Sequence, residues 1–162
     1  MQKQNILNEV RVVHLMPREL EIQPAWDGYM DQCLALLRRV QLPVEGVVTH
    51  QDHFLVALDG GVVVGVIGAE VYRPVALLRS LAVDPAWQKQ GIGAVLTESL
   101  LETLKEQNIT EVYLLTQTAE KFFLDRGFVK WDRSQAPASI AATHEFRELC
   151  PQSAILMQRK TL

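Results

Sequence analysis

The segment from Gln88 to Ala94 contains two glycines, Gly91 and Gly93, between a polar turn and a run of apolar residues at helical spacing. Glycine has no side chain to cover the backbone N–H groups, so a ligand can approach them closely. A helix that begins just after such a turn also offers free N–H groups and the positive end of its dipole, which suit a phosphate or a diphosphate. The spacing therefore predicts an anion-binding loop at the start of a helix.

Two well-known phosphate-binding motifs do not fit this loop. A Walker-type loop ends in Gly-Lys-Ser or Gly-Lys-Thr, whereas Ala-Val follows Gly93. A dinucleotide-binding fingerprint needs a third small residue, and Leu96 stands at that position. The remaining pattern is Gln-x-x-Gly-x-Gly, which follows a predicted strand and the sequence Asp84-Pro85. An ordinary strand-to-helix turn, with glycines that serve geometry alone, is the alternative interpretation.

The elements that hold this loop follow from hydrophobic periodicity and turn residues. Asp59-Gly60-Gly61 predicts an early hairpin, and later apolar residues at helical spacing predict crossover helices. The expected strands are 20–23, 54–58, 62–72, 75–83, 111–116, 128–131 and 153–158, and the expected helices are 30–40, 92–104, 119–126 and 137–146. This order predicts an α/β fold with a central mixed sheet and helices on both faces. Residues 1–18 are expected to be an N-terminal extension, and residues 19–162 a single domain.

Composition limits the class of protein and the kinds of partner. The 162 residues are 48% hydrophobic and 22% charged, which is typical of a soluble globular protein that buries a substantial core. The net charge of −3 gives no electrostatic reason to expect nucleic acid or an anionic membrane as a partner. The longest apolar run, 61–69, is too short to span a bilayer, and the N-terminus has no secretory leader pattern.

Cysteine and histidine spacing predicts neither a disulfide framework nor a metal site. Cys33 and Cys150 lie far apart in the sequence, which fits a reducing cytoplasm, and the role expected for Cys150 is that of a small buried hydrophobe. His50-x-x-His53 has no third ligand at a matching spacing, so no metal is expected there.

The loop and the segments around it resemble the GNAT family of N-acetyltransferases. Leu78–Pro85 leads into the loop, Leu114–Ala119 follows its helix, and Phe122–Phe128 ends in Arg-Gly-Phe. The last third of the chain is similar to the arsenic-resistance branch of this family, through Arg133, Pro137, Ile140, Thr143, Glu145-Phe146, Cys150-Pro151, Ser153-Ala154 and Met157. The resemblance covers the chain from His50 onward, and it extends more loosely to the acetyltransferase domain of N-acetylglutamate synthase.

The resemblance implies a GNAT-like acyl-CoA N-acyltransferase fold with acetyl-CoA as the co-substrate. In such folds the pantetheine arm lies along the strand before the loop, where two neighbouring strands splay apart. The strand backbone would then bind the pantetheine, and the loop N–H groups would hold the diphosphate. The residues implied in cofactor binding are Leu81, Ala82, Val83, Gln88, Lys89, Gln90, Gly91, Ile92, Gly93 and Ala94.

The acceptor implied by the resemblance is a small amino acid with a second acidic group. N-acetylglutamate synthase uses glutamate, and the arsenic-resistance enzymes are linked to arsinothricin and similar phosphinates, which mimic glutamate. Arginine supplies forked, permanently charged donors for such groups. The candidates are Arg79 first, then Arg133 and Arg147, and a solvated surface charge is the alternative role of each. Candidates for further hydrogen bonds to the substrate are Ser80, Thr116 and Ser153.

Two departures from the family pattern leave the proton route open. Many members carry a tyrosine in the short helix before Gly-Phe, and Phe123 stands there in this chain. Many also carry a glutamate on the strand before the loop, where this chain has Leu77-Leu78. Glu70 and His53 are the nearest candidates for a base by sequence. The alternative is catalysis by positioning and by backbone polarisation of the thioester carbonyl, with water carrying the proton.

The leading hypothesis is an acetyl-CoA-dependent N-acetyltransferase that acts on the α-amino group of a small acidic amino acid, such as arsinothricin or phosphinothricin. A biosynthetic enzyme that forms N-acetylglutamate is the second hypothesis. An acetyl-CoA-binding sensor without turnover is the third, because the usual tyrosine and glutamate are absent. We expect a cytoplasmic protein with no nucleic-acid or membrane partner, and a homodimer is compatible with the sequence without being demanded by it.

Overall fold

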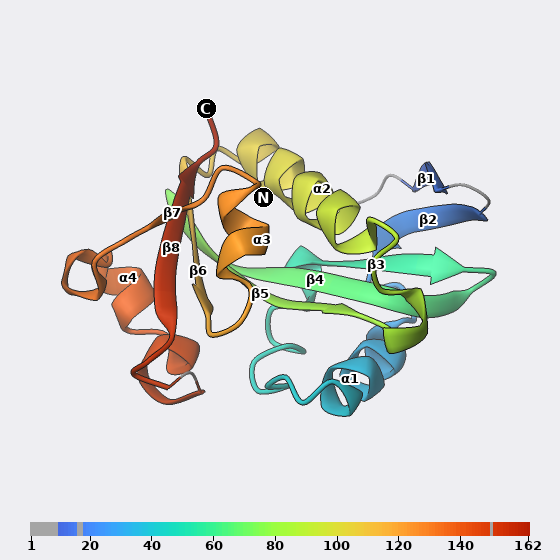
Figure 1. Cartoon of the computed structure of the whole chain (residues 1–162), viewed down its shortest axis with the longest axis horizontal. Helices are drawn as coiled ribbons and strands as arrows, with labels where there is room; N and C mark the ends of the chain where they lie inside the picture. Colours follow the sequence, from blue (N-terminus) through green and yellow to red (C-terminus); the bar gives the residue numbers. More distant parts are fainter. Residues whose placement is uncertain (1–9, 16–17, 150) are drawn as a thin grey trace, which may run out of the picture.

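The computed structural model describes residues 10–15, 18–149 and 151–162, and within these residues eight strands form one sheet in the order β1-β2-β3-β4-β5-β6-β8-β7 (Figure 1). The strands are β1 (Arg11–Leu15), β2 (Arg18–Pro24), β3 (Phe54–Asp59), β4 (Val62–Tyr72), β5 (Val75–Val83), β6 (Glu111–Thr116), β7 (Val129–Lys130) and β8 (Ile155–Lys160). The α-helices are α1 (Met30–Arg39), α2 (Ile92–Glu106), α3 (Glu120–Leu124) and α4 (Ala138–Ala141). Short 3₁₀ turns cover Gln51–His53, Pro85–Trp87 and Arg133–Gln135, and a π-helical turn covers Glu145–Leu149.

Among the described strands, one neighbouring pair in the middle of the sheet is parallel, and the other pairs are antiparallel. The strands from β1 to β5 run antiparallel to their neighbours, whereas β5 and β6 run parallel, with α2 as the crossover between them. This parallel pairing is short, because it joins only Val75–Leu77 to Glu111–Tyr113. β6 continues to pair with β8 as far as Thr116. β5 and β6 therefore separate toward their C-terminal ends.

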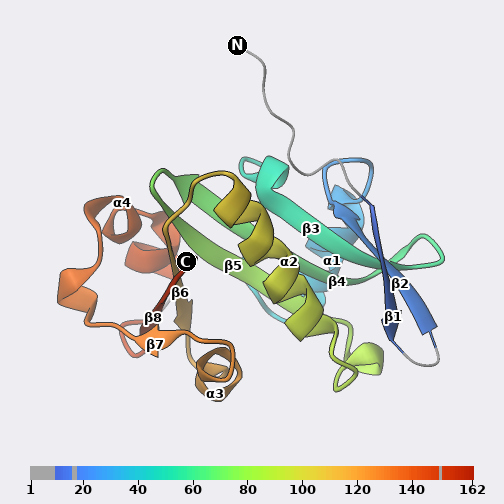
Figure 2. The same cartoon turned by 90° about the horizontal axis from the view of Figure 1, so that it is seen from above.

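The helices α1 and α2 cover opposite faces of the sheet (Figures 1 and 2). Cys33, Leu36 and Leu37 of α1 are buried in one cluster with Val56 and Val66 of the sheet. These α1 residues recur at the spacing of one helical face, so the opposite face meets solvent.

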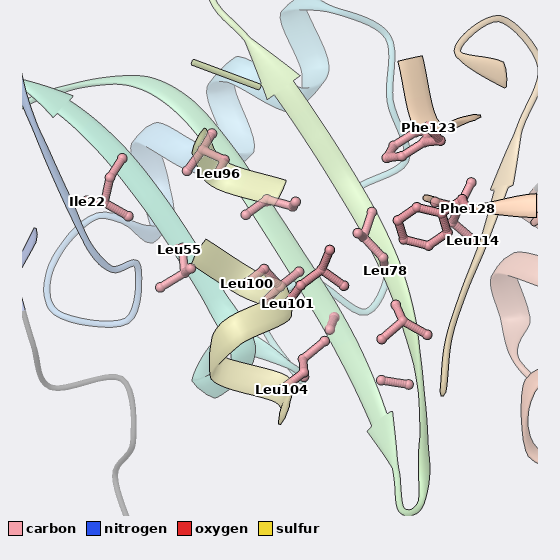
Figure 3. Close-up of a cluster of buried hydrophobic side chains, with 14 of the residues drawn as sticks. Ile22, Leu55, Leu78, Leu96, Leu100, Leu101, Leu104, Leu114, Phe123 and Phe128 are labelled. Atoms are coloured by element: carbon pink, nitrogen blue, oxygen red, sulfur yellow. The ribbon is translucent and has the colours of Figure 1, made fainter. Parts of the chain in front are cut away.

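α2 lies across β3, β4 and β5 and builds the larger core cluster (Figure 2). Its buried residues Leu96, Leu100 and Leu104 repeat every four positions, which places them on one stripe. Figure 3 shows this stripe against the sheet, with Leu78, Leu114 and the two phenylalanines Phe123 and Phe128 continuing the cluster toward α3. The predicted mixed sheet with helices on both faces is confirmed.

Two glycines of β4 allow close packing, as their position within a strand predicts. A Cβ atom on Gly65 would lie 2.9 Å from Leu96 Cδ1, so α2 approaches β4 at this point. A Cβ atom on Gly68 would lie 2.3 Å from the ring of Phe54, which occupies that space. Bulkier residues at either position would push these neighbours away.

The structure departs from the sequence expectations at both ends of the chain. Residues 11–15, expected to be part of an extension, form β1 and pair with β2 at the edge of the sheet. The expected helix 137–146 is divided into α4 and the π-helical turn. Thr143 Oγ1 donates to the Ile140 carbonyl and accepts from the Phe146 N–H group, so a side chain replaces regular helical bonds there. Tyr29 stands at the N-cap of α1 and its side chain makes no capping hydrogen bond.

Candidate active site

The predicted anion-binding loop has the geometry that its glycines require. Gly91, with φ 85°, lies in the left-handed region and directly precedes α2. The first hydrogen bond within α2 joins the Val95 N–H group to the Gly91 carbonyl at 3.1 Å. The N–H groups of 92–94 therefore have no acceptor within the helix and lie at the positive end of its dipole.

The strand and turn before the loop are fixed by polar side chains. The Asp84 carboxylate accepts from the Ala86 N–H group at 2.9 Å and caps the 3₁₀ turn Pro85–Trp87. The Gln88 side chain donates to the Val83 carbonyl at 3.2 Å, which ties the start of the loop to the end of β5. The loop residues Gln88–Gly91 are exposed and accessible to a ligand.

β5 carries a bulge just before this end. Arg79 pairs with Gly68 and Ala82 with Val66, so two residues of β5, Ser80 and Leu81, stand opposite one residue of β4. Ser80 has φ 61°, a conformation that side chains rarely adopt. A bulge leaves an extra residue out of the ladder and re-aims the strand. The bulge lies in the part of β5 that no longer pairs with β6. Backbone groups of β5 therefore face the opening between these two strands.

A pocket of about 450 Å³ occupies this opening. Residues 78–81 of β5 line one wall, and residues 114–119 at the end of β6 line the other. Phe123 of α3, the 41–43 loop, and the C-terminal segment with Glu145 complete the lining. Next to Phe123 in α3, the Phe122 ring lies 3.5 Å from the position of a Cβ atom on Gly93, so α3 approaches the anion-binding loop.

Three buried charged side chains form a cluster, and two of them, Arg79 and Glu145, line the pocket. Arg79, Glu70 and Glu145 are 4%, 5% and 8% exposed. Arg79 Nη1 donates to Glu70 Oε2 at 2.9 Å, Arg79 Nε donates to Ser80 Oγ at 3.0 Å, and Arg79 Nε lies 3.4 Å from Glu145 Oε2. Buried charges persist only when they are paired. Arg79 Nη2, also buried, has no hydrogen-bond partner among the described residues.

Glu70 is held from the side away from the pocket. The Tyr72 hydroxyl donates to Glu70 Oε1, and His50 Nε2 lies 3.4 Å from the same oxygen. Burial, with the neighbouring Glu70 carboxylate, raises the pKa of Tyr72, so this hydroxyl stays protonated and acts as a donor. A Cβ atom on Gly46 would lie 3.1 Å from Arg79 Nη1, so the backbone at Gly46 lies close to the guanidinium group.

The structure brings together one part of the predicted substrate site. Arg79, Ser80 and Thr116 line the pocket, and Leu81 lies beside them. Thr116 Oγ1 accepts from the Ala119 N–H group at 2.9 Å, so it also shapes the turn after β6.

The other predicted substrate residues lie outside the pocket lining. Arg133 donates to the Ala154 carbonyl at 3.0 Å and stacks over the Phe146 ring, so it fastens the C-terminal segment. Arg147 and Ser153 are exposed. A solvated charge, the alternative considered for Arg147, agrees with its exposure.

The two histidines of the His-x-x-His pattern lie in different surroundings, and neither His50 nor the candidate base His53 lines the pocket. His50 contacts Glu70, whereas burial lowers the pKa of His53, whose Nδ1 atom is buried without a hydrogen-bond partner in the described part of the chain. Within the described residues, no group of three or more His, Cys, Asp or Glu side chains is arranged to hold a metal ion. Cys150, expected to be a buried hydrophobe, lies outside the described residues.

Sequence reasoning gave Glu145 no chemical role. The residue belongs to a segment predicted as an ordinary helix, and a glutamate in a helix is usually exposed. Its burial depends on the π-helical turn, which has no clear signal in a single sequence. The contact of Glu145 with Arg79 could therefore be found only in three dimensions.

The pattern of the acetyltransferase (GNAT) family matches residues 16–128. The chain belongs to this family. A relative described as an uncharacterized N-acetyltransferase of Chlorobaculum tepidum is 31% identical over 115 residues, which are 70% of this chain and 71% of the relative. N-acetyltransferase 8B of Mus musculus is 31% identical over 126 residues, which are 72% of this chain and 53% of that protein. The GNAT chain is accordingly an acetyl-CoA-dependent N-acetyltransferase.

Solved structures share the GNAT fold. N-acetylglutamate synthase from Neisseria gonorrhoeae, in complex with coenzyme A and N-acetyl-glutamate, matches with a TM-score of 0.77 at 18% identity. The match covers 88% of this chain and 35% of the synthase chain, so the likeness concerns one part of that protein. In the described part of this chain, no helix combines the length and apolar character needed to cross a bilayer.

Proposed function

We propose that this enzyme transfers an acetyl group from acetyl-CoA to the α-amino group of a small acidic amino acid, with a glutamate mimic such as arsinothricin or phosphinothricin as the favoured acceptor. The observation that carries the proposal is the buried Arg79 Nη2 atom at the pocket, which has no hydrogen-bond partner among the described residues. A buried donor without an acceptor is costly, and a substrate carboxylate or phosphinate oxygen would supply the acceptor.

Acetyl-CoA fits the elements around the pocket from two sides. Its diphosphate would accept from the N–H groups of the Gln88–Ala94 loop, where the dipole of α2 also favours negative charge. Its pantetheine arm would lie in the opening between β5 and β6, beside Leu81, Ala82 and Val83. The thioester would then lie near the bulge at Ser80, where backbone groups outside the ladder can polarise its carbonyl.

The acceptor would lie between Arg79 and the end of β6. Arg79 would bind an acidic group, and the hydroxyl groups of Ser80 and Thr116 would add hydrogen bonds. We assign Glu70 the role of a positioning residue, because it holds Arg79 Nη1 and is not part of the pocket lining. Phe123 lines the pocket without a hydroxyl group, so the departing thiolate would take its proton from the reacting amine or from water.

The likeness to N-acetylglutamate synthase favours an amino acid as the acceptor and keeps a biosynthetic role as the second candidate. A much higher kcat/KM for glutamate than for phosphinothricin would select that candidate.

We also propose that the enzyme works in the cytoplasm, where Cys33, a buried free thiol with a pKa raised to about 12 by burial, stays reduced. A homodimer stays a prediction, and size-exclusion chromatography with light scattering tests it.

The test is the release of free thiol from acetyl-CoA with glutamate, glutamine, phosphinothricin and arsinothricin as acceptors. Arg79→Lys keeps the positive charge but loses the forked N–H donors of the guanidinium group. The kcat/KM for an accepted acidic amino acid should therefore fall about 10- to 100-fold, through a higher KM for the acceptor. Arg38→Lys is the matched control, since Arg38 is exposed on α1 and away from the pocket. Absence of thiol release with every acceptor would overturn the proposed function. Tight acetyl-CoA binding without turnover would favour the sensor hypothesis instead.

A further inference from the structure

Gln41 has a backbone conformation that glycine normally adopts. The residue follows α1, and its φ of 62° lies in the left-handed region. Its N–H group donates to the Arg38 carbonyl at 3.1 Å, and the Leu42 N–H group donates to the Leu37 carbonyl at 2.9 Å. These bonds form the Schellman motif, in which the left-handed residue is usually glycine and sometimes asparagine. A glutamine at this position is strained, and such strain is concentrated at functional sites.

The helix α2 ends in the same motif, away from the pocket. Asn108 has φ 64° and donates to the Lys105 carbonyl at 3.0 Å, while the Ile109 N–H group donates to the Leu104 carbonyl at 3.0 Å. Asn108 is exposed and is not part of the pocket lining, whereas Gln41 is exposed and belongs to the lining. The two left-handed residues therefore share a backbone motif and differ in what their side chains can meet.

Gln41 follows the helix that covers the face of the sheet to which Arg79 points. The helices α1 and α2 cover opposite faces (Figures 1 and 2). Leu78 packs in the cluster built by α2, and side chains alternate along a strand, so Arg79 points to the α1 face. The short distance between Arg79 Nη1 and a Cβ atom on Gly46 agrees with this direction, because Gly46 belongs to the segment after α1.

The end of α1 is held beside the turn that follows β5. Arg39 Nη2 donates to Asp84 Oδ2, which fixes the approach of the 41–43 loop to the pocket. The anion-binding loop precedes α2, the helix on the other face of the sheet. An acceptor bound by Arg79 would therefore meet the 41–43 loop, whereas the diphosphate of the coenzyme would lie on the α2 side.

An acceptor with two acidic groups needs a second donor in this pocket. Among the described lining residues, Arg79 is the one cationic side chain, and it is 4% exposed. The reacting amine must reach the thioester near the neighbouring bulge, so the α-carbon lies deep and the acceptor side chain extends outward. Gln41 offers a carboxamide with two N–H donors at the exposed end of this path.

We propose that the Gln41 carboxamide donates to the acidic group on the side chain of the acceptor, while Arg79 binds its α-carboxylate. Gln41 is thereby a specificity-determining residue, and its left-handed backbone directs the side chain to the pocket. The inference rests on the proposed function, because it concerns the acceptor of the same reaction.

The experiment compares the wild type with Gln41→Gly, Gln41→Glu and Gln41→Lys. Asn108→Gly and Asn108→Lys are the matched controls, because they make the same changes of backbone freedom and charge at the other Schellman motif. Thermal unfolding measures stability. Thiol release with glutamate and with glutamine, whose side chain is uncharged, gives KM and kcat for each acceptor and for acetyl-CoA.

We expect Gln41→Gly to be more stable and less active. Relief of the left-handed strain, partly offset by the greater freedom of glycine in the unfolded chain, should raise the Tm by about 1–4 °C. Loss of the carboxamide should lower kcat/KM for glutamate about 5- to 30-fold through KM, with an unchanged KM for acetyl-CoA. Asn108→Gly should not lower the Tm and should keep wild-type kinetics.

The charge variants separate a direct contact from a change in loop flexibility, because both keep a long side chain on the same backbone. Gln41→Glu should raise KM for glutamate about tenfold or more, since two negative charges would meet, and Gln41→Lys should lower it below the wild-type value. KM for glutamine should change by less than about threefold in both variants. Asn108→Lys should match the wild type with both acceptors.

Three results would overturn the inference while leaving the proposed function intact. These are wild-type kinetics of Gln41→Gly with glutamate, equal responses of glutamate and glutamine to the two charge variants, and a loss that appears in KM for acetyl-CoA instead of the acceptor. Acetylation of neutral amino acids alone would overturn both the acidic acceptor and the role of Gln41. Absence of thiol release with every acceptor would overturn the proposed function and the inference with it.

Discussion

Replacing Gly91 by alanine tests the anion-binding loop at the residue whose backbone conformation shapes it. Gly91 has φ 85° and directly precedes α2. A side chain in this left-handed region costs about 1–2 kcal/mol. In a chain of this size, such a cost lowers the Tm by about 2–8 °C.

The same substitution should weaken acetyl-CoA binding. Relief of the strain requires a different φ at Gly91, and this rotation would turn the N–H groups of 92–94 away from a common ligand. One hydrogen bond to a charged oxygen contributes about 1.5–3 kcal/mol. Loss of one such bond therefore lowers the affinity about 10- to 150-fold.

Gly61→Ala is the matched control for backbone strain. Gly61 has φ 83°, nearly the value at Gly91, and no heavy atom lies within 4 Å of an added Cβ. It lies in the turn between β3 and β4, which is not part of the pocket lining. We expect a similar loss of Tm in both variants and a loss of affinity in Gly91→Ala alone.

The assay is thermal unfolding with and without acetyl-CoA, supported by calorimetric titration. A ligand that binds only the folded state raises the Tm according to its affinity and concentration. Gly61→Ala should show the wild-type rise, and Gly91→Ala a clearly smaller one. Equal affinities of the two variants for acetyl-CoA would refute the assignment of the diphosphate to this loop.

Two further predictions concern the core and the pH dependence of stability. Gly65→Ala places a Cβ atom 2.9 Å from Leu96 Cδ1, so overpacking should lower the free energy of unfolding by about 1–3 kcal/mol, measured by urea denaturation. An unchanged free energy of unfolding would contradict the close approach of α2 to β4. Burial lowers the pKa of His53 from 6.5, so its contribution to stability is present above pH 6.5 and is lost as the pH falls through the lowered pKa. The Tm of the wild type and of the exposed-site control His14→Asn should therefore fall with acidification more steeply than that of His53→Asn. Equal slopes in all three proteins would contradict this role of His53.

Local signals were strong enough to predict the scaffold of the site. β5 and β6 have the predicted bounds, because apolar runs define them and Pro74, Asp84 and Thr116 stand at or beside their ends. The glycine pair between β3 and β4 and the loop before α2 depend on a few residues in sequence, so a single chain reveals them. These elements bring Arg79 and the loop into one region.

The inner arrangement of the pocket depends on contacts between segments far apart in the chain. The sequence marks Arg79 as a candidate for substrate binding, but its contacts with Glu70 and Glu145 depend on the folded chain. The bulge at Ser80 follows from the register between β4 and β5, which no local pattern at that position specifies. The contact of His50 with Glu70 joins the residue before the 3₁₀ turn Gln51–His53 to β4. Such features are set by tertiary packing, which propensity and periodicity do not encode.

The central claim is that backbone N–H groups of 88–94 hold the diphosphate of acetyl-CoA, and calorimetric titration tests it most directly. We predict that the wild type binds acetyl-CoA and coenzyme A, and that acetyl-pantetheine, which lacks the diphosphate, binds at least about tenfold more weakly. Absence of heat and of any rise in Tm at about 1 mM acetyl-CoA, or equally tight binding of acetyl-pantetheine, would contradict the account.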